Sequence, residues 1–495
     1  KPLYYYNYKN TLYFSSSLET FKKIPNLKLK IDKNALNIFL KRGYIPNSKT
    51  IYENIFKVEK STLILFKKLY NNQIIKQSII NWFEDKKKTN KNENSLKQNS
   101  NTLENLLNNS VKEQLVADVP VGVLLSGGVD SSLVATLASK ISNNKINTFT
   151  VGFKNSKYDE SSKATKIANY LKTNHQNYIL DESEALQIIS DLPNVFSEPF
   201  ADSSQIPQIL LSKYVSKNVK VVLSGDGGDE LFGGYNRYIH TNFLWKIFSQ
   251  MPVILKKLIL KSFLINSENT WDNIYKYFLN HFHSNKIAFF GNKVHKFSSA
   301  GINSLTPLDF YNNINCIWSN TDEIENYQLD KNIDNLNYDS NKNIIDNFME
   351  FDLDEYLPDD ILCKVDRSSM YYSLESRAPF LNIDIYKFIQ NVPIEQKVKS
   401  GSGKIILKSI LNNHLPEKLF NLPKQGFSIP LSDWIKGSLR DIINDNLTND
   451  KIINDGHFNH KIVHKILDEH MKGKFNHDKK IWTLFNYFLW KNNNK

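Results

Sequence analysis

The stretch LLSGGVDSS, residues 124–132, joins two segments of different hydrophobic period. An apolar run that begins at Val121 leads into it, and apolar residues at helical spacing, such as Leu133 and Leu137, follow it. A buried strand that passes through a glycine-rich loop into a helix is typical of a βαβ unit. Glycine lets the backbone approach a ligand closely, and the N–H groups at the start of a helix attract anions. The stretch therefore predicts a loop that holds a phosphate or pyrophosphate.

A tight turn alone would explain the glycines of this loop but not its serines and its aspartate. The pattern GxxxxGK[ST] is absent, so the loop is not the usual γ-phosphate loop. We therefore favour a binding function for the loop over a purely structural one.

Strand and helix patterns alternate around the loop. We predict strands at residues 121–126, 146–153, 175–180 and 220–226, and helices at residues 133–141, 161–172 and 183–192. This alternation indicates an α/β fold with a parallel sheet and helices on both faces. From about Tyr238 onward the chain reads as mostly helical.

The aspartate of the loop raises the question of a metal ion. A carboxylate beside phosphates is repelled unless a cation such as Mg²⁺ lies between them, and that cation commonly uses one or two carboxylates. A second acidic loop, SGDGGDE at residues 224–230, follows the predicted strand that ends near Leu223. Since ligands bind at the carboxyl ends of parallel strands, we expect this loop, which carries Asp226, Asp229 and Glu230, to supply a second carboxylate to a metal ion held by Asp130.

The first part of the chain differs in character from the rest. Residues 2–6 and 12–16 alternate in the manner of a hairpin, and residues 61–66 read as a further strand. From Glu84 to Asn101 there is almost no apolar residue. We predict a β-rich segment at 1–84, a linker at 85–101 and a main domain at 102–495.

Composition excludes several classes of protein. With 41% hydrophobic and 23% charged residues, the chain is globular. The net charge of +12 could suit nucleic acid or an acidic membrane surface, but lysine and asparagine are abundant throughout, which indicates a compositional bias, so we expect no nucleic-acid partner. Cys316 and Cys363 are the only cysteines, which excludes a disulfide framework and a four-cysteine zinc site and favours a reducing, cytoplasmic location.

The longest apolar stretch, MPVILKKLILKSFLI at residues 251–265, is interrupted by lysines. It predicts an amphipathic helix rather than a membrane span, so we expect no membrane partner. The first residues, KPLYYYNYKN, carry no signal-peptide pattern and no Met, which suggests that the sequence begins inside a longer chain.

Together these motifs carry a resemblance to a known family. SGGVDSS resembles the pyrophosphate-binding loop of the ATP pyrophosphatase superfamily, and SGDGGDELFGGY resembles the second signature of the asparagine synthetase family. Further similar blocks follow in order: YLPDDILCKVDRSSM from Tyr356, SLESRAPFLN from Ser373, GKIILKSIL from Gly403 and LPKQGFSIPL from Leu422. Residues 1–84 resemble the end of the family's glutaminase domain, without its nucleophilic cysteine, which neither Cys316 nor Cys363 can replace.

The resemblance implies a fold and a reaction. The fold would be an ATP pyrophosphatase domain, of the adenine nucleotide alpha hydrolase type, with a helical C-terminal region and a β-rich remnant of an Ntn-type glutaminase domain. The enzyme would convert aspartate to asparagine through a β-aspartyl-adenylate, with ATP and Mg²⁺, and release AMP and pyrophosphate. Nitrogen would come from ammonia, or from glutamine in a complete parent protein. The resemblance also allows a homodimer.

By the same resemblance, site roles fall on particular residues. The phosphates would be held by Ser126, Gly127, Gly128, Ser131 and Ser132, with Ser224 and Gly225 of the second loop, and the adenine would meet the backbone near Leu124 and Val151. Asp130 and Asp229 would bind Mg²⁺. Lys404 and Lys424 would neutralise developing charge on the phosphates, and Asp226 would position or deprotonate ammonia.

Three positions depart from the family pattern. Asp226 stands for a Glu and Gly228 for a Ser, which leaves open an amidotransferase that acts on another carboxylate, such as a sugar acid in polysaccharide synthesis. Asn382 stands for an Asp and is interpreted as a neutral helix cap.

Other residues of note have open or structural roles. Arg367, Glu375 and Arg377 would suit either an acid-binding pocket or a structural ion-pair network. His281 and His283 are interpreted as surface residues, and Tyr235 and Tyr238 as core or helix-face residues.

Two rival functions remain. A tRNA-modifying ATP pyrophosphatase would share the first loop, but it would need paired cysteines or would lack the later blocks. A non-catalytic nucleotide-binding remnant is disfavoured because both predicted metal acids and both lysines are present.

Overall fold

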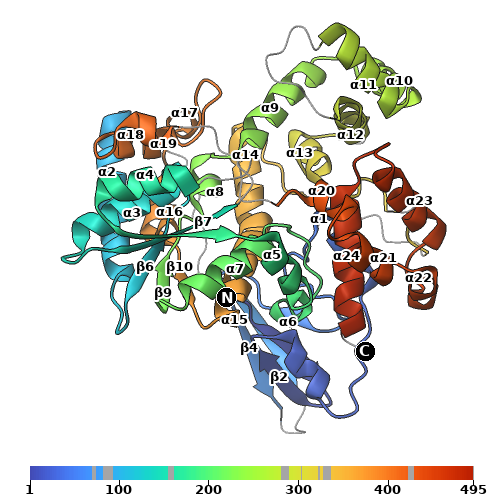
Figure 1. Ribbon diagram of the computed structural model, residues 1–495, viewed down its shortest axis with the longest axis horizontal. Helices are drawn as coiled ribbons and strands as arrows, with labels where there is room; N and C mark the ends of the chain where they lie inside the picture. Colours follow the sequence, from blue (N-terminus) through green and yellow to red (C-terminus); the bar gives the residue numbers. More distant parts are fainter. Residues whose placement is uncertain are drawn as a thin grey trace.

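The computed structural model describes residues 1–69, 74–81, 93–153, 161–279, 289–302, 304–321, 324–326, 336–421 and 429–493. Figure 1 shows N-terminal strands at the bottom, a sheet covered by helices at the left and a helical region at the right.

The N-terminal part contains two small antiparallel sheets. Its elements are β1 (Tyr4–Tyr8), β2 (Thr11–Ser15), α1 (Lys33–Arg42), β3 (Phe56–Lys57), β4 (Thr62–Lys68) and β5 (Ile74–Asn81). β1 and β2 form the predicted hairpin, in which Tyr6 faces Tyr13. Lys9 and Asn10 both have positive φ, which suits a two-residue hairpin turn. The strand predicted at residues 61–66 is also confirmed, as β4.

A five-stranded parallel sheet lies at the centre of the α/β part. Its order is β10-β9-β6-β7-β8, with β6 (Val121–Leu124), β7 (Asn147–Phe153), β8 (Asn174–Leu180), β9 (Val221–Leu223) and β10 (Glu375–Arg377). The four predicted strands and the parallel pairing are therefore confirmed. β10 was not predicted, because its three residues are polar and only backbone hydrogen bonds to β9 define it, such as that from Ser224 N to Arg377 O at 2.8 Å.

Helices cover both faces of this sheet, as predicted (Figure 1). The helices are α2 (Leu96–Gln114), α3 (Val129–Ile141), α4 (Ser161–Leu171), α5 (Glu182–Ile189), α6 (Leu192–Val195) and α7 (Gln205–Val215). Successive residues of β9 point to opposite faces: Leu223 packs in one core with Leu133 of α3, and Val222 packs in another with Ile206 of α7.

The predicted linker is wrong over its last residues. Helix α2 begins at Leu96, so residues 96–101 are helical. Ser95 and Gln98 form a reciprocal capping box, and Leu103 and Leu107 are fully buried. Two of the polar residues that suggested a linker are in fact buried: Asn99, which donates to the Gln396 side chain at 2.9 Å, and Ser100.

The remainder is helical, as expected. It contains α8 (Gly228–Phe232), α9 (Asn236–Ser249), α10 (Val253–Ile265), α11 (Glu268–Ile274), α12 (Phe290–Ile302), α13 (Pro307–Asn315), α14 (Ile344–Phe351), a π-helical segment (Asp352–Leu362), α15 (Cys363–Tyr371), α16 (Ile383–Ile389), α17 (Ile394–Lys397), α18 (Ile405–Asn412), α19 (Glu417–Phe420), α20 (Leu431–Lys436), α21 (Arg440–Asn446), α22 (Asn449–Asp455), α23 (His460–Met471) and α24 (Asp478–Asn493).

One hydrophobic core joins distant parts of the chain. Phe39 of α1, Ile209 of α7 and Trp482 of α24 belong to the same buried cluster. The N-terminal part and the C-terminal helices are therefore packed on one face of the parallel sheet. Within the described residues, no helix is both long enough and apolar enough to cross a membrane.

A buried glutamate lies just behind the second glycine loop. Glu230 of α8 is 2% exposed and accepts a hydrogen bond from the Tyr235 hydroxyl at 2.6 Å. Burial, reinforced by the charge of Asp229, raises the pKa of Glu230 to about 7. Tyr238, nearby on α9, is fully buried, and Tyr235 is partly buried against the same hydrophobic cluster, which agrees with the core or helix-face role predicted for the two tyrosines.

We predict that Glu230→Gln stabilises the fold at alkaline pH. The raised pKa means that folded Glu230 binds a proton that the unfolded chain releases near pH ~4.3, so wild-type stability falls as pH rises from there through about 7. Glutamine stays neutral and still accepts the Tyr235 hydrogen bond. At pH ~8 the variant should gain about 3 kcal/mol in free energy of unfolding, so calorimetry should show a melting temperature a few degrees above that of wild type. At pH ~4 the two melting temperatures should differ little.

Glu395→Gln is the matched control, because Glu395 is exposed. It should leave the melting temperature unchanged at both pH values. A Glu230→Gln effect of equal size at both pH values would contradict the assigned pKa.

Candidate active site

Two loops meet at the carboxyl edge of the parallel sheet. β6 and β9 are neighbours, with Val123 opposite Leu223, so the loops that follow them start side by side. A Cβ added to Gly228 of the second loop would lie 2.5 Å from Cγ of Asp130 in the first. Only glycine fits at position 228 with Asp130 in this place, so the two loops are packed against each other.

A lysine from a third segment lies between the two predicted metal ligands. The Lys404 ammonium forms ion pairs with Asp130 and, at 2.7 Å, with Asp229. The three side chains are largely buried, with exposed fractions of 9% for Lys404 and 14% for each aspartate. Burial opposes the charge of Lys404, but both carboxylates raise its pKa above the ordinary value. The sequence thus predicted three residues that the fold brings together.

The backbone holds Lys404 in an unusual conformation. It precedes α18 with φ of 60°, in the left-handed region, and its N–H donates to the carbonyl of Phe232 at 3.0 Å. Left-handed backbone is costly for a residue other than glycine. Lys404 has this backbone conformation at the position from which its side chain forms ion pairs with both aspartates.

The donor set fits a magnesium ion that also binds phosphate. Two carboxylates already surround one positive charge, that of Lys404. In the described part of the chain, no group of three or more His, Cys, Asp or Glu side chains could complete a metal site by itself. Mg²⁺ characteristically takes one or two carboxylates and fills the rest of its shell with water and substrate phosphate.

The first loop offers small donors at a helix start. Ser126 and Ser131 share a hydrogen bond of 3.0 Å between their hydroxyls, and Gly127 has φ of +79°. Gly128 precedes α3 and makes no side-chain cap, so the N–H groups of the first turn face the loop. Ser132 is fully buried, and its hydroxyl has no hydrogen-bond partner among the described residues.

The proposed adenine contacts lie on adjacent strands. Leu124 ends β6 and is paired with Phe149 of β7, and Val151 lies two residues further along β7. Both residues therefore lie near the carboxyl edge of the sheet, where the first loop begins.

Asp226 and Ser224 interact within the second loop. The Ser224 hydroxyl donates to the Asp226 carboxylate at 2.7 Å. Burial raises the pKa of Asp226, although this hydrogen bond and the charge of Lys364 oppose the rise. Gly225 lies against Asp130, as an added Cβ would be 3.0 Å from Cβ of that residue.

Sequence reasoning missed Lys364. It is 7% exposed, forms an ion pair with Asp202 and donates to the Ser204 hydroxyl at 2.7 Å. Burial opposes its charge, yet the carboxylates of Asp202, Asp360 and Asp226 raise its pKa. The signal was available, because Lys364 lies inside the matched block from Tyr356, but spacing alone does not distinguish it from a surface lysine.

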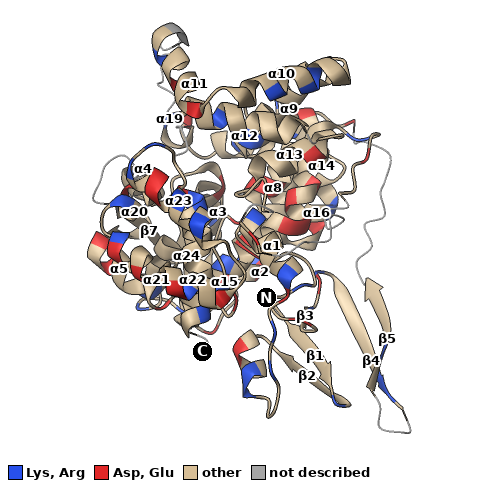
Figure 2. Cartoon of the chain, turned by 90° about the vertical axis from the view of Figure 1, so that its right-hand side faces the viewer, with Lys and Arg blue, Asp and Glu red and all other residues tan. Residues whose placement is uncertain are grey.

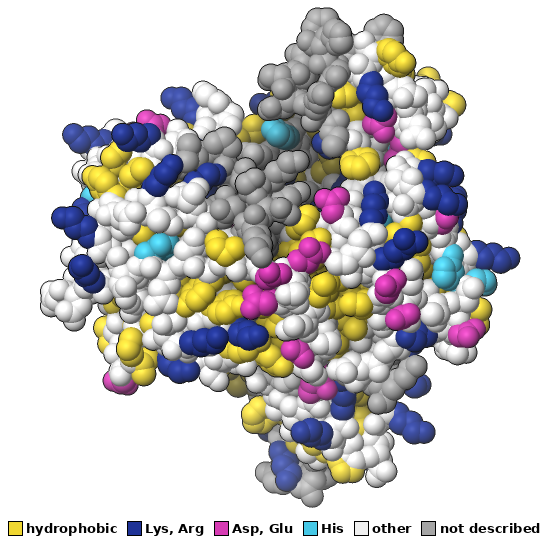
Figure 3. Space-filling view, in the orientation of Figure 1, with side chains coloured by type: hydrophobic (Ala, Val, Ile, Leu, Met, Phe, Trp, Pro, Cys, Tyr) yellow, Lys and Arg dark blue, Asp and Glu magenta, His cyan; other side chains and the backbone are white. Residues whose placement is uncertain are grey.

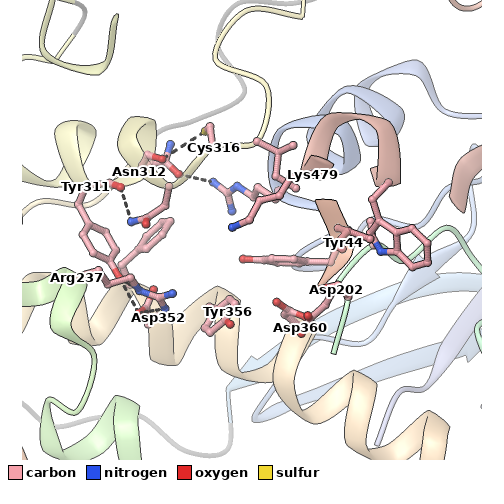
Figure 4. Close-up of a pocket in the computed structure, with 18 residues that line it drawn as sticks. Tyr44, Asp202, Arg237, Tyr311, Asn312, Cys316, Asp352, Tyr356, Asp360 and Lys479 are labelled. Atoms are coloured by element: carbon pink, nitrogen blue, oxygen red, sulfur yellow. Dashed lines mark hydrogen bonds and ion pairs between the residues drawn. The ribbon is translucent and has the colours of Figure 1, made fainter. Parts of the chain in front are cut away.

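Asp202, the ion-pair partner of Lys364, lines a cavity of about 220 Å³. Figure 4 shows it between α13, the π-helical segment and α24, with Asp202 and Asp360 facing Tyr44. Asp360 is 5% exposed and its Oδ1 has no hydrogen-bond partner in the described chain. Burial and the charge of Asp202 raise the pKa of Asp360 well above its usual range. No predicted site residue lines the described walls of this cavity.

Arg367, Glu375 and Arg377, whose roles the sequence left open, contact other parts of the chain. Arg367 donates to the Tyr4 hydroxyl and to the carbonyl of Ser16, which ties α15 to the N-terminal part. Arg377 pairs with Glu375 at 2.8 Å and donates to the backbone carbonyls of Gln114, the last residue of α2, and Val116. Asn382 caps α16, as interpreted from the sequence.

Some predicted residues cannot be placed. Lys424, His281 and His283 lie outside the described residues.

Comparison with known proteins gives two family matches. The asparagine synthase model matches residues 102–492, and the glutamine amidotransferase domain model matches residues 1–77.

Curated relatives agree with this assignment. Asparagine synthetase (glutamine-hydrolyzing) 1 of Bacillus subtilis is 28% identical over 99% of this chain and 73% of its own length. Asparagine synthetase (glutamine-hydrolyzing) 3 of the same organism is 23% identical over 88% of this chain and 66% of its own. The asparagine synthetase of Zea mays is 37% identical over 28% of this chain and 25% of its own. The chain therefore belongs to the asparagine synthase family and is an enzyme of the amide-forming ligase type.

Proposed function

We propose that this chain converts aspartate to asparagine. The side-chain carboxylate would attack the α-phosphorus of ATP and release pyrophosphate, which gives a β-aspartyl-adenylate. Ammonia would then attack its carbonyl carbon, lose a proton and displace AMP to form the amide. The observation that carries the proposal is the position of the Lys404 ammonium between Asp130 and Asp229. It shows that a buried positive charge is stabilised where the two loops meet, beside the start of α3.

Phosphate binding is assigned to the first loop. Ser126, Ser131 and the backbone of Gly127 and Gly128 offer small donors, and the first turn of α3 adds a positive helix end. Ser224 and Gly225 flank the same space from the second loop. The backbone at Leu124 and Val151 would contact the adenine.

Charge neutralisation is assigned to Asp130, Asp229 and Lys404. The two aspartates would hold Mg²⁺, which supplies positive charge to the pyrophosphate when bound. The Lys404 ammonium contacts both aspartates, so it would lie beside a metal ion that they hold. From there it would contact oxygens of the same pyrophosphate. Lys424 is proposed for the same task on the sequence alone.

Amide formation is assigned to Asp226. Its raised pKa makes its carboxylate a better base than an exposed aspartate, and the Ser224 hydroxyl orients it. Lys364 links Asp226 electrostatically to Asp202, which lines the cavity. In this proposal ammonia is the direct nitrogen source, and glutamine would supply it in a complete parent protein.

The second candidate is an amidotransferase for another carboxylate, such as a sugar acid. Two observations favour it: Asp226 is shorter than the glutamate of the family pattern, and Gly228 leaves no room for a side chain beside Asp130. In this proposal Asp226 belongs to the acceptor side of the site, whereas Gly228 lies against Asp130 on the ATP side.

Product analysis tests the proposal. We expect mass spectrometry to detect AMP and asparagine in equal amounts after incubation with ATP, Mg²⁺, aspartate and ammonium. AMP formation that requires a sugar acid in place of aspartate would support the second candidate. Absence of AMP with every carboxylate offered would refute both.

We predict that Asp130→Asn lowers pyrophosphate release by about a thousandfold, because it removes one of the two carboxylates proposed to hold the metal. Calorimetric titration should also show loss of the Mg²⁺ dependence of ATP binding. Asp468→Asn is the control, since that carboxylate forms only a surface pair with Lys472. Wild-type activity in Asp130→Asn, with its melting temperature unchanged, would defeat the metal assignment.

We predict that Asp226→Asn separates the two half-reactions. Adenylate formation should persist, and the exchange of labelled pyrophosphate into ATP measures it. Amide formation should fall by about a hundredfold, because the base is lost. An equal fall in both rates would assign Asp226 to the ATP side of the site instead.

A further inference from the structure

Helix α10 is oriented differently from the amphipathic expectation. It forms as predicted, but several of its large apolar side chains face solvent: Ile254 is 76% exposed, Leu258 61% and Ile265 83%. Lys256, in contrast, is 9% exposed, donates to the carbonyl of Ser304 and lies over the Trp245 ring. Lys256 and the fully buried Leu260 therefore attach the helix to the protein, while several apolar residues of the opposite face point outward.

These apolar residues form one stripe with lysines beside it. At 100° per residue, positions 254, 258 and 265 lie within about 40° of one another around the helix axis. Lys257 and Lys261 are exposed and adjoin the stripe on one side. We call Ile254, Lys257, Leu258, Lys261 and Ile265 the outer face of α10.

The charge around this face is of one sign. Residues 231–267 contain no Asp or Glu but include Arg237, Lys246 and the three lysines of α10. The next acids along the chain, Glu268 and Asp272, are engaged with α12: Glu268 accepts from Asn292, and Asp272 accepts from the N–H of Gly291. Residues 231–267 therefore add only positive charge to the region of the outer face.

The position of the helix leaves it accessible. Figure 1 shows α10 at the end of the molecule opposite the N-terminal strands, and Figure 2 shows lysines along it. In the space-filling view of Figure 3, hydrophobic and basic side chains lie together on this lobe.

We propose that the outer face of α10 docks on the surface of an anionic lipid membrane. An interfacial helix places its apolar stripe at the headgroup boundary, while flanking lysines contact acidic headgroups. The cores of protein–protein interfaces are instead depleted in lysine, so a second copy of the chain fits the outer face less well. This contact would lie on the surface and does not require a membrane-spanning helix. It is independent of the proposed function.

The test is flotation of the full chain with vesicles of phosphatidylcholine alone and of phosphatidylcholine mixed with phosphatidylglycerol. We expect binding to the mixed vesicles only, with strong weakening at high salt. The double variant Ile254→Ser/Leu258→Ser should lower the partition coefficient roughly tenfold or more, since two exposed aliphatic side chains are lost. Lys257→Glu/Lys261→Glu should abolish the preference for anionic lipid.

Ile453→Ser is the matched control, because Ile453 is also an exposed isoleucine, on α22, at 55% exposure. It should bind as wild type does, and all variants should keep the wild-type melting temperature. Equal binding to both vesicle types, no binding, or binding unchanged in the double variant would overturn the proposal. So would light scattering that shows a dimer dissociated by Ile254→Ser/Leu258→Ser, which would assign the face to a second copy.

Discussion

The ion pairs of Lys404 with Asp130 and Asp229 constrain the whole candidate site. A largely buried ammonium is costly unless carboxylates surround it, and removal of either partner leaves charge without compensation. The three residues come from the starts of α3, α8 and α18, which are far apart in the sequence. Their association therefore requires the parallel sheet, which sets β6 beside β9, and the packing of residues 403 and 404 against Phe232 and Gly233.

Small residues allow this charge cluster to form. Gly228 lies against the Asp130 carboxyl, and an added Cβ at Gly234 would lie 2.1 Å from both Asp229 and Lys404. The glycines of the second loop thus act mainly by making room for charged groups of other elements, in addition to their freedom to turn. This explains why an acid-rich loop is also glycine-rich.

Buried polar groups extend from this site toward the N-terminal part. Asp202, Lys364 and Asp360 follow one another beside the cavity, and Arg237 binds Asp352 and the Tyr311 hydroxyl deeper in the helical region. In a low-dielectric interior such groups polarise one another, which strengthens the hydrogen bonds between them. The polar interior between the N-terminal part and the α/β part is therefore organised by charge pairing as much as by apolar packing.

The sequence by itself determined the alternating strands and helices and the two glycine-rich, acidic loops, because hydrophobic period and glycine placement are local properties of the chain. Asp229 and Lys404 became candidates through the family resemblance of their motifs. Tertiary structure decided what local patterns do not contain. Polar β10 exists because it pairs with β9, and Lys364 differs from other lysines because Asp202 and Asp360 surround it. Residues 96–101 are helical because α2 buries its apolar stripe, and the apolar outer face of α10 is exposed because the helix packs on the protein through Lys256 and Leu260. In each case the deciding energy comes from partners distant in sequence, through burial and charge pairing, and these partners are known only once the chain is folded.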